Sequence, residues 1–424
     1  MEIFKRLESE VRGYIRAFPT IFTTARGAQM TDESGRHYLD FFAGAGTLNY
    51  GHNHPDLKAA AIEYLTHDGL VHGLDMASTA KAAFLQAFDE CILEPRGLRY
   101  KLQFTGPTGT NAMEAAIKLA RNVTGRTRIV AFTHGFHGMT QGALACTANN
   151  KFREAGGVPP GSHVTFMPFD GYLGSGIDTA KLLRQMIEDP SSGLDMPAAV
   201  LLETVQGEGG VNVASSEWLQ AIAKLCREHD ILLVVDDIQA GCGRTGSFFS
   251  FERAGIVPDI ITLSKSLSGL GLPMALVLLK PELDIWKPSQ HNGTFRGNNL
   301  AFVTATAALN TFWRDRRFQQ AIEAKARLVS SRLEPLVREF PQKLSRRGVG
   351  LMQGLVFQDP RQAAQVAQAA FDEGLIIEGC GAFDEVLKLL PPLTIPLEEL
   401  EQGLKLLETL TRRVLEPIKE EVSA

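Results

Sequence analysis

The sequence predicts an α/β protein that has a large domain with a mostly parallel sheet and a smaller α+β domain. The first observation is a series of seven short apolar runs, which predict buried strands, with helical patterns between them. Alternating strands and helices are typical of a parallel sheet with helices on both faces. The second observation is a change after about residue 300, where long helical patterns dominate and few strands follow.

The seven predicted strands are rich in Val, Ile, Leu and Phe without alternation, as expected for strands that are covered on both faces. They begin at Leu102, Ile129, Val164, Ala199, Ile231, Ile260 and Ala275. Helices are predicted over 111–122 and 216–229, because apolar residues recur on one face of each segment. Ser215 or Ser216 is the expected N-cap of the second helix.

Three parts are predicted along the chain: an N-terminal segment over 1–50, a large domain over 51–300 and a small C-terminal domain over 301–424. The N-terminal segment contains a predicted hairpin over 27–41 with its turn at 32–35, and we expect it to pack with the small domain. The small domain is predicted to contain a long helical region over 301–340, strands at 350–357 and 374–377 on either side of a helix over 360–373, and a final helix from Leu397.

Composition excludes several classes of protein. The 424 residues include 43 Lys or Arg and 48 Asp or Glu, so the formal charge is −5 and nucleic acid is not an expected partner. No apolar run reaches the length of about 18 residues that a membrane span needs, and the charged start is not a signal peptide. The five cysteines are far apart, which favours a cytoplasmic protein without a disulfide framework or a cysteine metal site.

The residues that follow each strand are the informative ones, because ligands bind at the carboxyl ends of parallel strands. Thr105-Gly-Pro-Thr-Gly-Thr-Asn follows the strand at Leu102 and leads directly into a helix. Gly109 and Thr110 lie at that helix N-terminus, where free N–H groups and the helix dipole favour a phosphate. The segment lacks the Gly-Lys-Ser/Thr of a P-loop, and an ordinary capped turn is the alternative.

Two further strand ends carry aromatic and acidic residues. Phe136 and His137 lie between glycines after the strand at Ile129, where an aromatic ring could stack on a flat ligand. The alternative is a loop with Phe136 in the core, and no metal is expected because a third ligand is missing. Glu203 and Glu208 follow the strand at Ala199, where they could contact a polar ligand, cap a helix or form surface ion pairs.

An aspartate follows the predicted strand at Ile231, and a lysine follows the one at Ile260. Asp236 is costly to bury unless a cation such as a protonated ring nitrogen faces it. Lys265 must either be paired, with Asp236 or Asp237 for example, or serve as an amine nucleophile with a lowered pKa. The pattern Gly-x-Gly-x-x-Gly over 241–246 is a weak dinucleotide signal, since no helix is predicted after it and two aspartates precede it.

Together these strand ends offer an anion cradle, a stacking aromatic ring, an aspartate for a pyridinium and a reactive lysine. That set is what pyridoxal 5'-phosphate requires.

The sequence also resembles the class III (ω-type) pyridoxal-phosphate aminotransferases of fold type I, over essentially the whole chain. The motifs that carry the resemblance are Asn49-Tyr-Gly-His-Asn-His-Pro, Gly106-Pro-Thr-Gly-Thr-Asn, Phe136-His-Gly, Glu203-x-x-Gln-Gly-Glu-Gly-Gly, Asp236-Asp-Ile-Gln-x-Gly-x-Gly-Arg-Thr-Gly, Ser264-Lys, Gly293-Thr-Phe-Arg-Gly-Asn and Pro391-Pro-Leu-Thr-Ile. Within this family, Asp40-Phe-Phe-Ala-Gly-Ala-Gly-Thr-Leu-Asn and His291-Asn-Gly-Thr-Phe-Arg-Gly-Asn-Asn look most like the diaminobutyrate–2-oxoglutarate aminotransferases of ectoine synthesis. The motifs do not separate that branch from relatives that make the same diamine for a siderophore.

The resemblance implies roles for the residues around the cofactor. Lys265 is expected to bond the cofactor aldehyde and then to move the proton between substrate carbon and cofactor. Asp236 would keep the ring nitrogen protonated, Gln239 would bond the ring hydroxyl, and Phe136 would stack on the ring. Gly109 and Thr110 are expected to bind the phosphate, and His137 and Glu203 are placed around the cofactor as well.

Other residues are expected to complete the site. Thr294 resembles a threonine that reaches the phosphate of the neighbouring subunit, so a homodimer or higher homo-oligomer with a shared active site is expected. Glu208 resembles a glutamate that pairs with a substrate-binding cation. In many relatives that cation is an arginine three residues before Pro391, where this sequence has Lys388. Since lysine cannot make a two-pronged contact, the carboxylate would be bound by Lys388 as a point charge or by Arg296. Asn49 is a further expected substrate contact.

The implied reaction is the transfer of an amino group from L-glutamate to L-aspartate 4-semialdehyde, which gives 2-oxoglutarate and L-2,4-diaminobutyrate. Another ω-amine such as ornithine, 4-aminobutyrate or a diamine, or an aminomutase reaction, stays open because the ring chemistry is the same. A binding module that retains the cofactor without turnover fits less well with an intact Lys265 and Asp236. A nicotinamide-dependent dehydrogenase is the remaining alternative.

Overall fold

The computed structural model describes residues 1–157 and 163–416, and its largest sheet has seven strands. Their order is β4-β12-β11-β10-β7-β5-β6, in which β12 is antiparallel to both neighbours and the other adjacent pairs are parallel. The strands are β4 (Lys101–Phe104), β5 (Ile129–Phe132), β6 (Val164–Met167), β7 (Ala199–Leu202), β10 (Leu232–Asp236), β11 (Ile260–Leu263) and β12 (Leu276–Leu279). The seven predicted strands and the mostly parallel sheet are thus confirmed.

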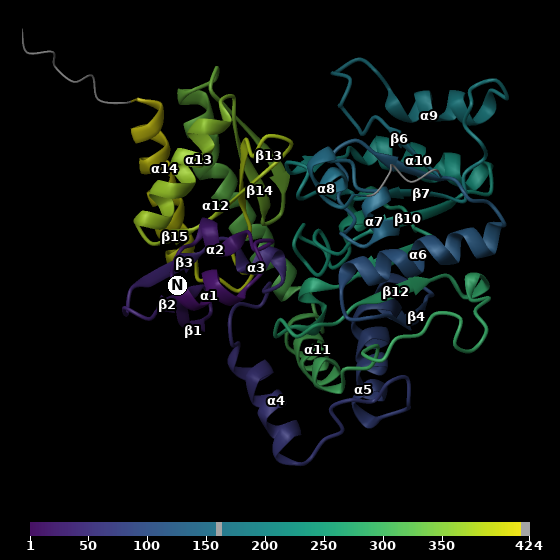
Figure 1. Cartoon of the computed structure of the whole chain (residues 1–424), viewed down its shortest axis with the longest axis horizontal. Helices are drawn as coiled ribbons and strands as arrows, with labels where there is room; N and C mark the ends of the chain where they lie inside the picture. The colour runs from purple at the N-terminus through teal and green to yellow at the C-terminus, as the bar shows by residue number, and fades with distance from the viewer. Residues whose placement is uncertain (158–162, 417–424) are drawn as a thin grey trace, which may run out of the picture.

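Helices cover both faces of this sheet (Figure 1). The helix α6 (Gly109–Thr124) packs on β10, β11 and β12, and α10 (Ser216–Glu228) packs on β10 and on α9 (Thr179–Glu188). Val234 of β10 lies in the apolar cluster of α6, whereas its neighbours Leu233 and Val235 lie in the cluster of α10. Since successive strand residues point to opposite faces, the two helices lie on opposite sides of the sheet.

The N-terminal hairpin pairs with a strand from the C-terminal part of the chain. The strands β1 (Phe22–Arg26), β2 (Gln29–Asp32) and β3 (His37–Asp40) are antiparallel neighbours, and β3 pairs in parallel with β15 (Leu375–Ile376). The predicted turn is present, because the N–H of Gly35 donates to the carbonyl of Asp32 at 3.0 Å. The division of the chain into three domains stays a prediction.

The C-terminal part forms a second four-stranded sheet with helices against it, on the left in Figure 1. Its elements are α12 (Arg317–Glu339), β13 (Leu344–Val349), β14 (Met352–Phe357), α13 (Pro360–Asp372), β16 (Glu378–Cys380), β17 (Val386–Leu389) and α14 (Leu397–Leu415). The helix predicted over 360–373 is present as α13, and the final helix begins at Leu397 as predicted.

The prediction of one long helical region over 301–340 was wrong in one respect. The segment contains two helices, α11 (Asn299–Phe312) and α12, with a break at 313–316. At the break the buried indole of Trp313 donates from Nε1 to the hydroxyl of Tyr50 at 2.8 Å. The carboxylate of Asp315 then accepts the backbone N–H of Arg317. The contact of Trp313 with Tyr50 and the carboxylate of Asp315 thus replace backbone hydrogen bonds that a continuous helix would form here.

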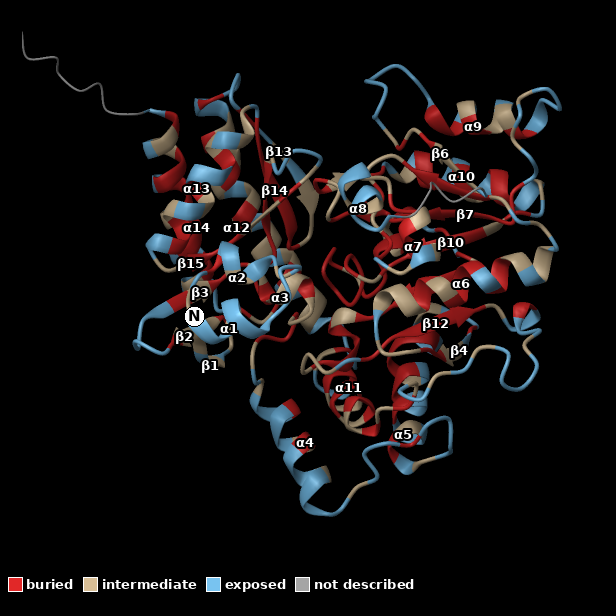
Figure 2. Cartoon of the chain, viewed as in Figure 1, coloured by how far each residue is buried: buried red, intermediate tan, exposed pale blue. Residues whose placement is uncertain are grey.

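The remaining helices and strands lie between these elements in the chain or before them. They are α1 (Glu2–Leu7), α2 (Tyr14–Ala17), α3 (Ala43–Gly46), α4 (Pro55–Thr66), α5 (Thr79–Phe88), α7 (Gln141–Ala145), α8 (Asn150–Ala155), β8 (Val205–Gln206), β9 (Asn212–Val213) and the short helices η1 (Asp89–Leu93), η2 (Glu94–Arg96), η3 (Ser250–Ala254), η4 (Lys265–Ser268) and η5 (Pro281–Leu283). Figure 2 shows that buried residues gather in the large sheet, whereas most of α4 is exposed. None of the described helices is both long and apolar enough to cross a membrane.

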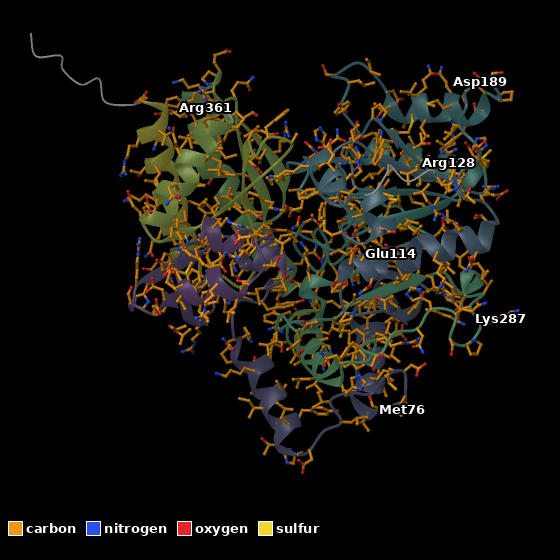
Figure 3. The ribbon with its side chains drawn as sticks, in the orientation of Figure 1. Met76, Glu114, Arg128, Asp189, Lys287 and Arg361 are labelled. Atoms are coloured by element: carbon orange, nitrogen blue, oxygen red, sulfur yellow. The ribbon has the colours of Figure 1, made fainter. Side chains whose placement is uncertain are left out.

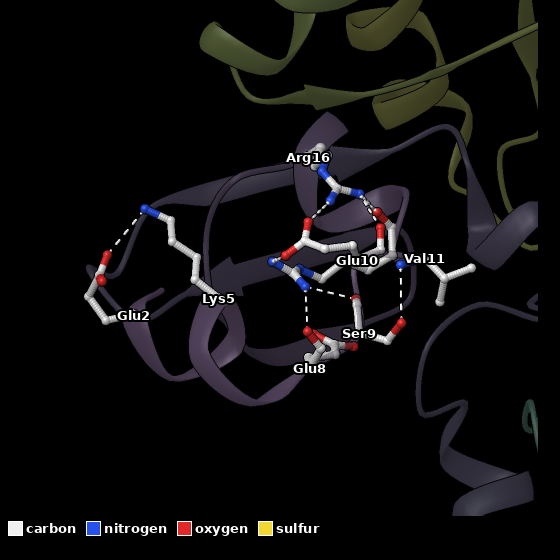
Figure 4. Close-up of polar contacts among 8 residues, drawn as sticks. Glu2, Lys5, Glu8, Ser9, Glu10, Val11 and Arg16 are labelled. Atoms are coloured by element: carbon white, nitrogen blue, oxygen red, sulfur yellow. Dashed lines mark hydrogen bonds and ion pairs between the residues drawn. The ribbon is translucent and has the colours of Figure 1, made fainter.

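Ion pairs connect residues within the N-terminal segment over 2–16, which contains α1 and the start of α2 (Figure 4). Lys5 pairs with Glu2 at 3.1 Å, and the carboxylate of Glu10 pairs with both Arg12 and Arg16. Exposed pairs of this kind contribute on the order of 0 to 1 kcal/mol each. These pairs therefore contribute little to the stability of the fold.

Candidate active site

Lys265 is the second residue after β11 and has a strained backbone, with φ at 46°. Its Nζ donates to the carbonyl of Ala45 at 2.9 Å. Ala45 belongs to α3, a left-handed turn in which residues 43–46 all have positive φ. Burial lowers the pKa of Lys265. Lys388 lowers this pKa further, whereas Glu208 raises it. The net shift is downward, which favours the neutral amine over the ammonium form.

Asp236 ends the central strand β10 and is held on both of its oxygens. Oδ2 lies 2.8 Å from Nδ1 of His137, and Oδ1 accepts hydrogen bonds at 3.2 Å from the hydroxyl of Thr262 and from the N–H of Ile238. Lys265 forms no ion pair with Asp236 or Asp237 in the part of the chain that the structure describes. The interpretation of Lys265 as a purely structural partner of these aspartates is therefore not supported.

A cavity of about 170 Å³ lies between these residues. It is lined by nine of the predicted site residues and by two others: Gly109, Thr110, Phe136, His137, Glu203, Glu208, Asp236, Gln239 and Lys265, together with Gly138 and Ile238. The ends of β4, β5, β7, β10 and β11 thus meet at one edge of the sheet, as parallel strands require.

One end of the cavity is built around the start of α6, where Gly109 and Thr110 lie. The hydroxyls of Thr110 and Thr140 are 2.6 Å apart, and Thr140 donates to Oε1 of Glu114 at 2.5 Å. Since Thr140 has one hydroxyl proton, Thr110 is the donor between the two threonines. Gly138 has a φ of 127°, which favours glycine. A Cβ at this position would lie 2.3 Å from Thr110 Oγ1, so only glycine fits beside the start of α6.

Glu114 is a residue that the sequence reasoning missed. Figure 3 shows it on α6 near the middle of the molecule, whereas Arg361 and Asp189 lie at the periphery. Besides Thr140 it accepts the backbone N–H groups of Gly142 at 2.8 Å and Ala143 at 3.1 Å. A sequence signal existed, because Thr110 and Glu114 are four residues apart on one helix and so share a face.

Gln239 lines the cavity and has a hydrogen-bond acceptor without a partner among the described residues. Gln239 donates from Nε2 to the carbonyl of Ala45 at 3.0 Å and to Glu208 Oε1 at 2.9 Å. These contacts fix the amide so that its Oε1 points into a buried position where it has no partner among the described residues. A ligand hydroxyl would satisfy that oxygen.

Glu203 and Phe136 are linked across the cavity wall. Oε2 of Glu203 accepts the backbone N–H of Phe136 at 3.0 Å, which fixes the loop that carries the aromatic ring. Burial raises the pKa of Glu203 to about 7. His137 lowers this pKa and Asp236 raises it. Glu203 therefore fixes the loop of Phe136 and interacts electrostatically with both Asp236 and His137.

Lys388 lies beyond Glu208 and is completely buried. It forms ion pairs with Glu208 and, at 3.2 Å, with Oε2 of Glu378. The two carboxylates outweigh burial and raise the pKa of Lys388, while Lys388 and Lys265 outweigh burial at Glu208 and lower its pKa to about 2. Lys388 and Glu208 thus form a charged pair. Glu378 is the second site residue that the sequence reasoning missed.

The structure does not place the other three predicted residues at this cavity. Both ends of the Asn49 amide are engaged elsewhere, since Nδ2 donates to the carbonyl of Cys242 at 2.9 Å and Oδ1 accepts from buried Arg244. Thr294 is exposed on the surface loop before α11. Arg296 donates to the carbonyl of His291 at 3.1 Å within the same loop.

Comparison with known proteins decides the family. Residues 13–410 match the model of the aminotransferase class-III family. The chain belongs to the class-III aminotransferases. A diaminobutyrate–2-oxoglutarate transaminase of Bordetella parapertussis is 62% identical over 410 residues, which are 96% of this chain and 94% of that protein. The protein of the same name from Halomonas elongata is 57% identical over 97% of this chain and 99% of its own length.

The fold agrees with solved structures of this class. A crystal structure of ornithine aminotransferase from Toxoplasma gondii, with pyridoxal phosphate at partial occupancy in its active site, superposes with a TM-score of 0.82. The two chains are 25% identical, and the match covers 98% of this chain and 94% of the other. This likeness confirms the predicted fold type.

Class-III aminotransferases use pyridoxal 5'-phosphate and act on amino acids and oxo acids, and the cavity fits this cofactor. Asp236 offers an anion for a ring nitrogen, the unpartnered Oε1 of Gln239 offers an acceptor for a ring hydroxyl, and α6 offers free N–H groups for a phosphate. The buried amine of Lys265 lies in the same cavity, where an aldehyde would meet it.

Proposed function

We propose that the protein transfers the amino group of L-glutamate to the aldehyde carbon of L-aspartate 4-semialdehyde, giving 2-oxoglutarate and L-2,4-diaminobutyrate. The observation that carries this proposal is the 62% identity, over 96% of the chain, to a protein named diaminobutyrate–2-oxoglutarate transaminase. The 57% identity to a second protein of that name supports it independently. Supply of the diamine for ectoine or a siderophore is the proposed role.

The side chains of the cavity take defined roles in this proposal. When bound, pyridoxal phosphate supplies an aldehyde that takes up the amino group and a ring that withdraws electrons from the substrate carbon. Lys265 moves a proton to and from that carbon, and its lowered pKa suits a general base. Asp236, held by His137, keeps negative charge at the ring nitrogen.

The substrates differ in where their charges lie, and Glu208 is proposed to respond to this difference. Glutamate presents a carboxylate beside its reacting carbon, whereas aspartate semialdehyde has its carboxylate at the far end. The ion pair between Glu208 and Lys388 neutralises the lysine when no carboxylate is near it, and it can open when one enters. Gln239 supports Glu208 in the closed state, through a bond of 2.9 Å.

The proposal includes a homodimer or higher homo-oligomer in which Thr294 completes the phosphate site of the neighbouring subunit. The exposed position of Thr294, next to Phe295 with 67% of its surface exposed, supports this role. We also propose a cytoplasmic location, which the five unpaired and buried cysteines support.

A panel of amino donors tests the reaction. L-2,4-diaminobutyrate, ornithine and 4-aminobutyrate would be compared with 2-oxoglutarate as acceptor, and products would be identified by mass spectrometry. The proposal expects a strong preference for diaminobutyrate, with no turnover by the Lys265→Ala variant. Equal use of the three donors would contradict it. Ornithine is the second candidate, since the Toxoplasma ornithine aminotransferase shares the fold over 98% of this chain.

A further inference from the structure

A second cavity, of about 500 Å³, shares a wall with the catalytic cavity, because Phe136 and Glu208 line both of them. The rings of Phe136 and of Phe152 on α8 lie edge to face, with 5.3 Å between their centroids. The helix α8 therefore packs against the loop that carries Phe136. Asn150, Phe152 and Arg153 of this helix line the second cavity.

Arg153 supplies the positive charge of this second cavity. Among the described residues that line it, Arg153 and Glu208 are the charged side chains near pH 8. Burial lowers the pKa of His134, so its imidazole is neutral at that pH. Glu208 is already compensated, since it pairs with Lys388 and accepts from Gln239. The cavity therefore presents a positive charge that no carboxylate of its described lining neutralises.

The partners of Arg153 within residues 1–157 and 163–416 are neutral groups. Its Nη2 donates to the side-chain oxygen of Asn150, and its guanidinium carbon lies 5.0 Å from the centroid of the Phe166 ring. No carboxylate in those ranges forms an ion pair with it. A guanidinium has five N–H donors, so several of them are open to a ligand. The side chain is half-buried, so solvent screens its charge less than that of an exposed residue.

The two proposed amino donors share the position of one carboxylate. In L-2,4-diaminobutyrate the carboxylate lies at the same number of bonds from the reacting carbon as the side-chain carboxylate of L-glutamate. Glutamate alone has a second carboxylate, beside its reacting carbon, for which Lys388 and Arg296 are the candidates. When the diamine is bound, Glu208 covers Lys388 through their ion pair. The carboxylate at the far end therefore needs a different cation.

We infer that Arg153 binds this far carboxylate in both half-reactions: the α-carboxylate of L-2,4-diaminobutyrate and the side-chain carboxylate of L-glutamate. The inference rests on the proposed function. A substrate whose reacting carbon lies at Lys265 extends past Phe136 and Glu208 toward the second cavity. The guanidinium exchanges its bond to the Asn150 amide for two parallel bonds to the carboxylate. Arg153 thus selects substrates that carry a carboxylate at this distance from the reacting carbon.

The test compares Arg153→Met with the wild-type holoenzyme. Methionine keeps an apolar stem beside Phe166 and is a good helix former, so the variant is expected to fold. Lys151→Met is the matched control, because it removes the same charge from the same helix at an exposed residue outside the lining of the second cavity. Arg153→Lys keeps the charge but loses the two-pronged contact, so it should recover only part of the activity.

Each half-reaction is followed separately by the absorbance of the cofactor. For Arg153→Met, kcat/KM with L-2,4-diaminobutyrate and with L-glutamate should fall about 30-fold, as expected for loss of a charge pair. With 1,3-diaminopropane, which is the same diamine without its carboxylate, kcat/KM should stay within about threefold of wild type. In the Lys265→Ala background, calorimetry should show the same loss of affinity for L-2,4-diaminobutyrate, which separates binding from chemistry.

Three results would overturn the inference in different ways. If the wild-type enzyme prefers diaminobutyrate over ornithine and 4-aminobutyrate, and Arg153→Met uses it as well as wild type does, Arg153 does not bind the carboxylate although the proposed function stands. If the wild-type enzyme shows no such preference, the proposed function fails and the inference fails with it. An equal loss with 1,3-diaminopropane, or the same loss in Lys151→Met, would indicate a general effect of α8 and would also overturn the inference.

Discussion

His137 Nδ1 lies 2.8 Å from Asp236 Oδ2, and both side chains are buried at the centre of the site. Burial opposes the charge on His137, but the hydrogen bond and charge of Asp236, with Glu203, outweigh it and raise the pKa of the imidazole. Asp236 thus favours the protonated form of His137, its partner on Oδ2. A buried carboxylate needs partners of this kind, and His137 provides one at the end of an apolar strand.

The first prediction concerns the pH dependence of this pair. Because the folded pKa of His137 is raised above its ordinary value of 6.5, the pair stabilises the fold fully below pH 6.5. That stability is lost as the pH rises through the folded value. In the cofactor-free protein, His137→Asn should therefore lower the free energy of unfolding by about 2 to 3 kcal/mol at pH 6, and by less at pH 9.

Urea unfolding at pH 6, 7.5 and 9 measures this difference. The same difference at all three values would mean that His137 is neutral and only donates a hydrogen bond.

The second prediction concerns Glu203, whose pKa is raised by burial from 4.5 to about 7. The unfolded chain releases this proton at a lower pH than the folded chain, so Glu203 costs stability as the pH rises from 4.5 through 7. The cost reaches at most about 3 kcal/mol above pH 7. Glu203→Gln should therefore raise the melting temperature at pH 8 and change it little at pH 5. A variant that is less stable than wild type at pH 8 would contradict the raised pKa.

The residues that follow buried strands could be predicted from the sequence for a simple reason. Parallel strands end at the same edge of a sheet, so Glu203, Asp236 and Lys265 meet there although they are far apart in the chain. The apolar runs themselves predict the strands because both sheet faces are covered. Fold and cofactor chemistry thus follow from local patterns plus one topological rule.

Other parts of the site depend on information that local patterns lack. Glu378 faces Lys388 only because of the register of β16 with β17, which a sequence does not specify without the turn between them. The left-handed turn over 43–46 holds Lys265 and Gln239 through the carbonyl of Ala45. Its two alanines at positive φ contradict their own backbone preference, so tertiary contacts must impose it.

The third prediction concerns Glu114, which orders the cradle around Thr110. Glu114→Ala removes the acceptor of the Thr140 hydroxyl and of the backbone N–H groups of Gly142 and Ala143. Unsatisfied buried donors cost about 1 to 3 kcal/mol, so a lower melting temperature is expected. Affinity for pyridoxal phosphate should fall roughly tenfold, because Thr140 no longer fixes Thr110. Spectroscopic titration of the cofactor-free protein measures this affinity, and Glu188→Ala on α9 is a surface control.

The fourth prediction distinguishes the two candidate cations for the substrate carboxylate. Arg296 lies in the loop of Thr294 and has a weak contact with Asp75 at 3.8 Å. If it binds substrate in the proposed oligomer, Arg296→Ala should raise KM for both substrates about tenfold while the protein stays folded. Unchanged Michaelis constants would leave Lys388 as the binding cation.

The fifth prediction concerns the charge of Lys388. Lys388→Met would leave Glu208 and Glu378 facing each other in a buried position without a cation, and breaking such a cluster costs about 3 to 5 kcal/mol. The double variant Lys388→Met with Glu378→Gln removes one of the two orphaned charges, so it should recover part of the loss. Thermal unfolding of the three proteins at pH 8 measures both steps. If the double variant is no more stable than Lys388→Met alone, the lost stability comes from the packing of the lysine stem and not from its charge.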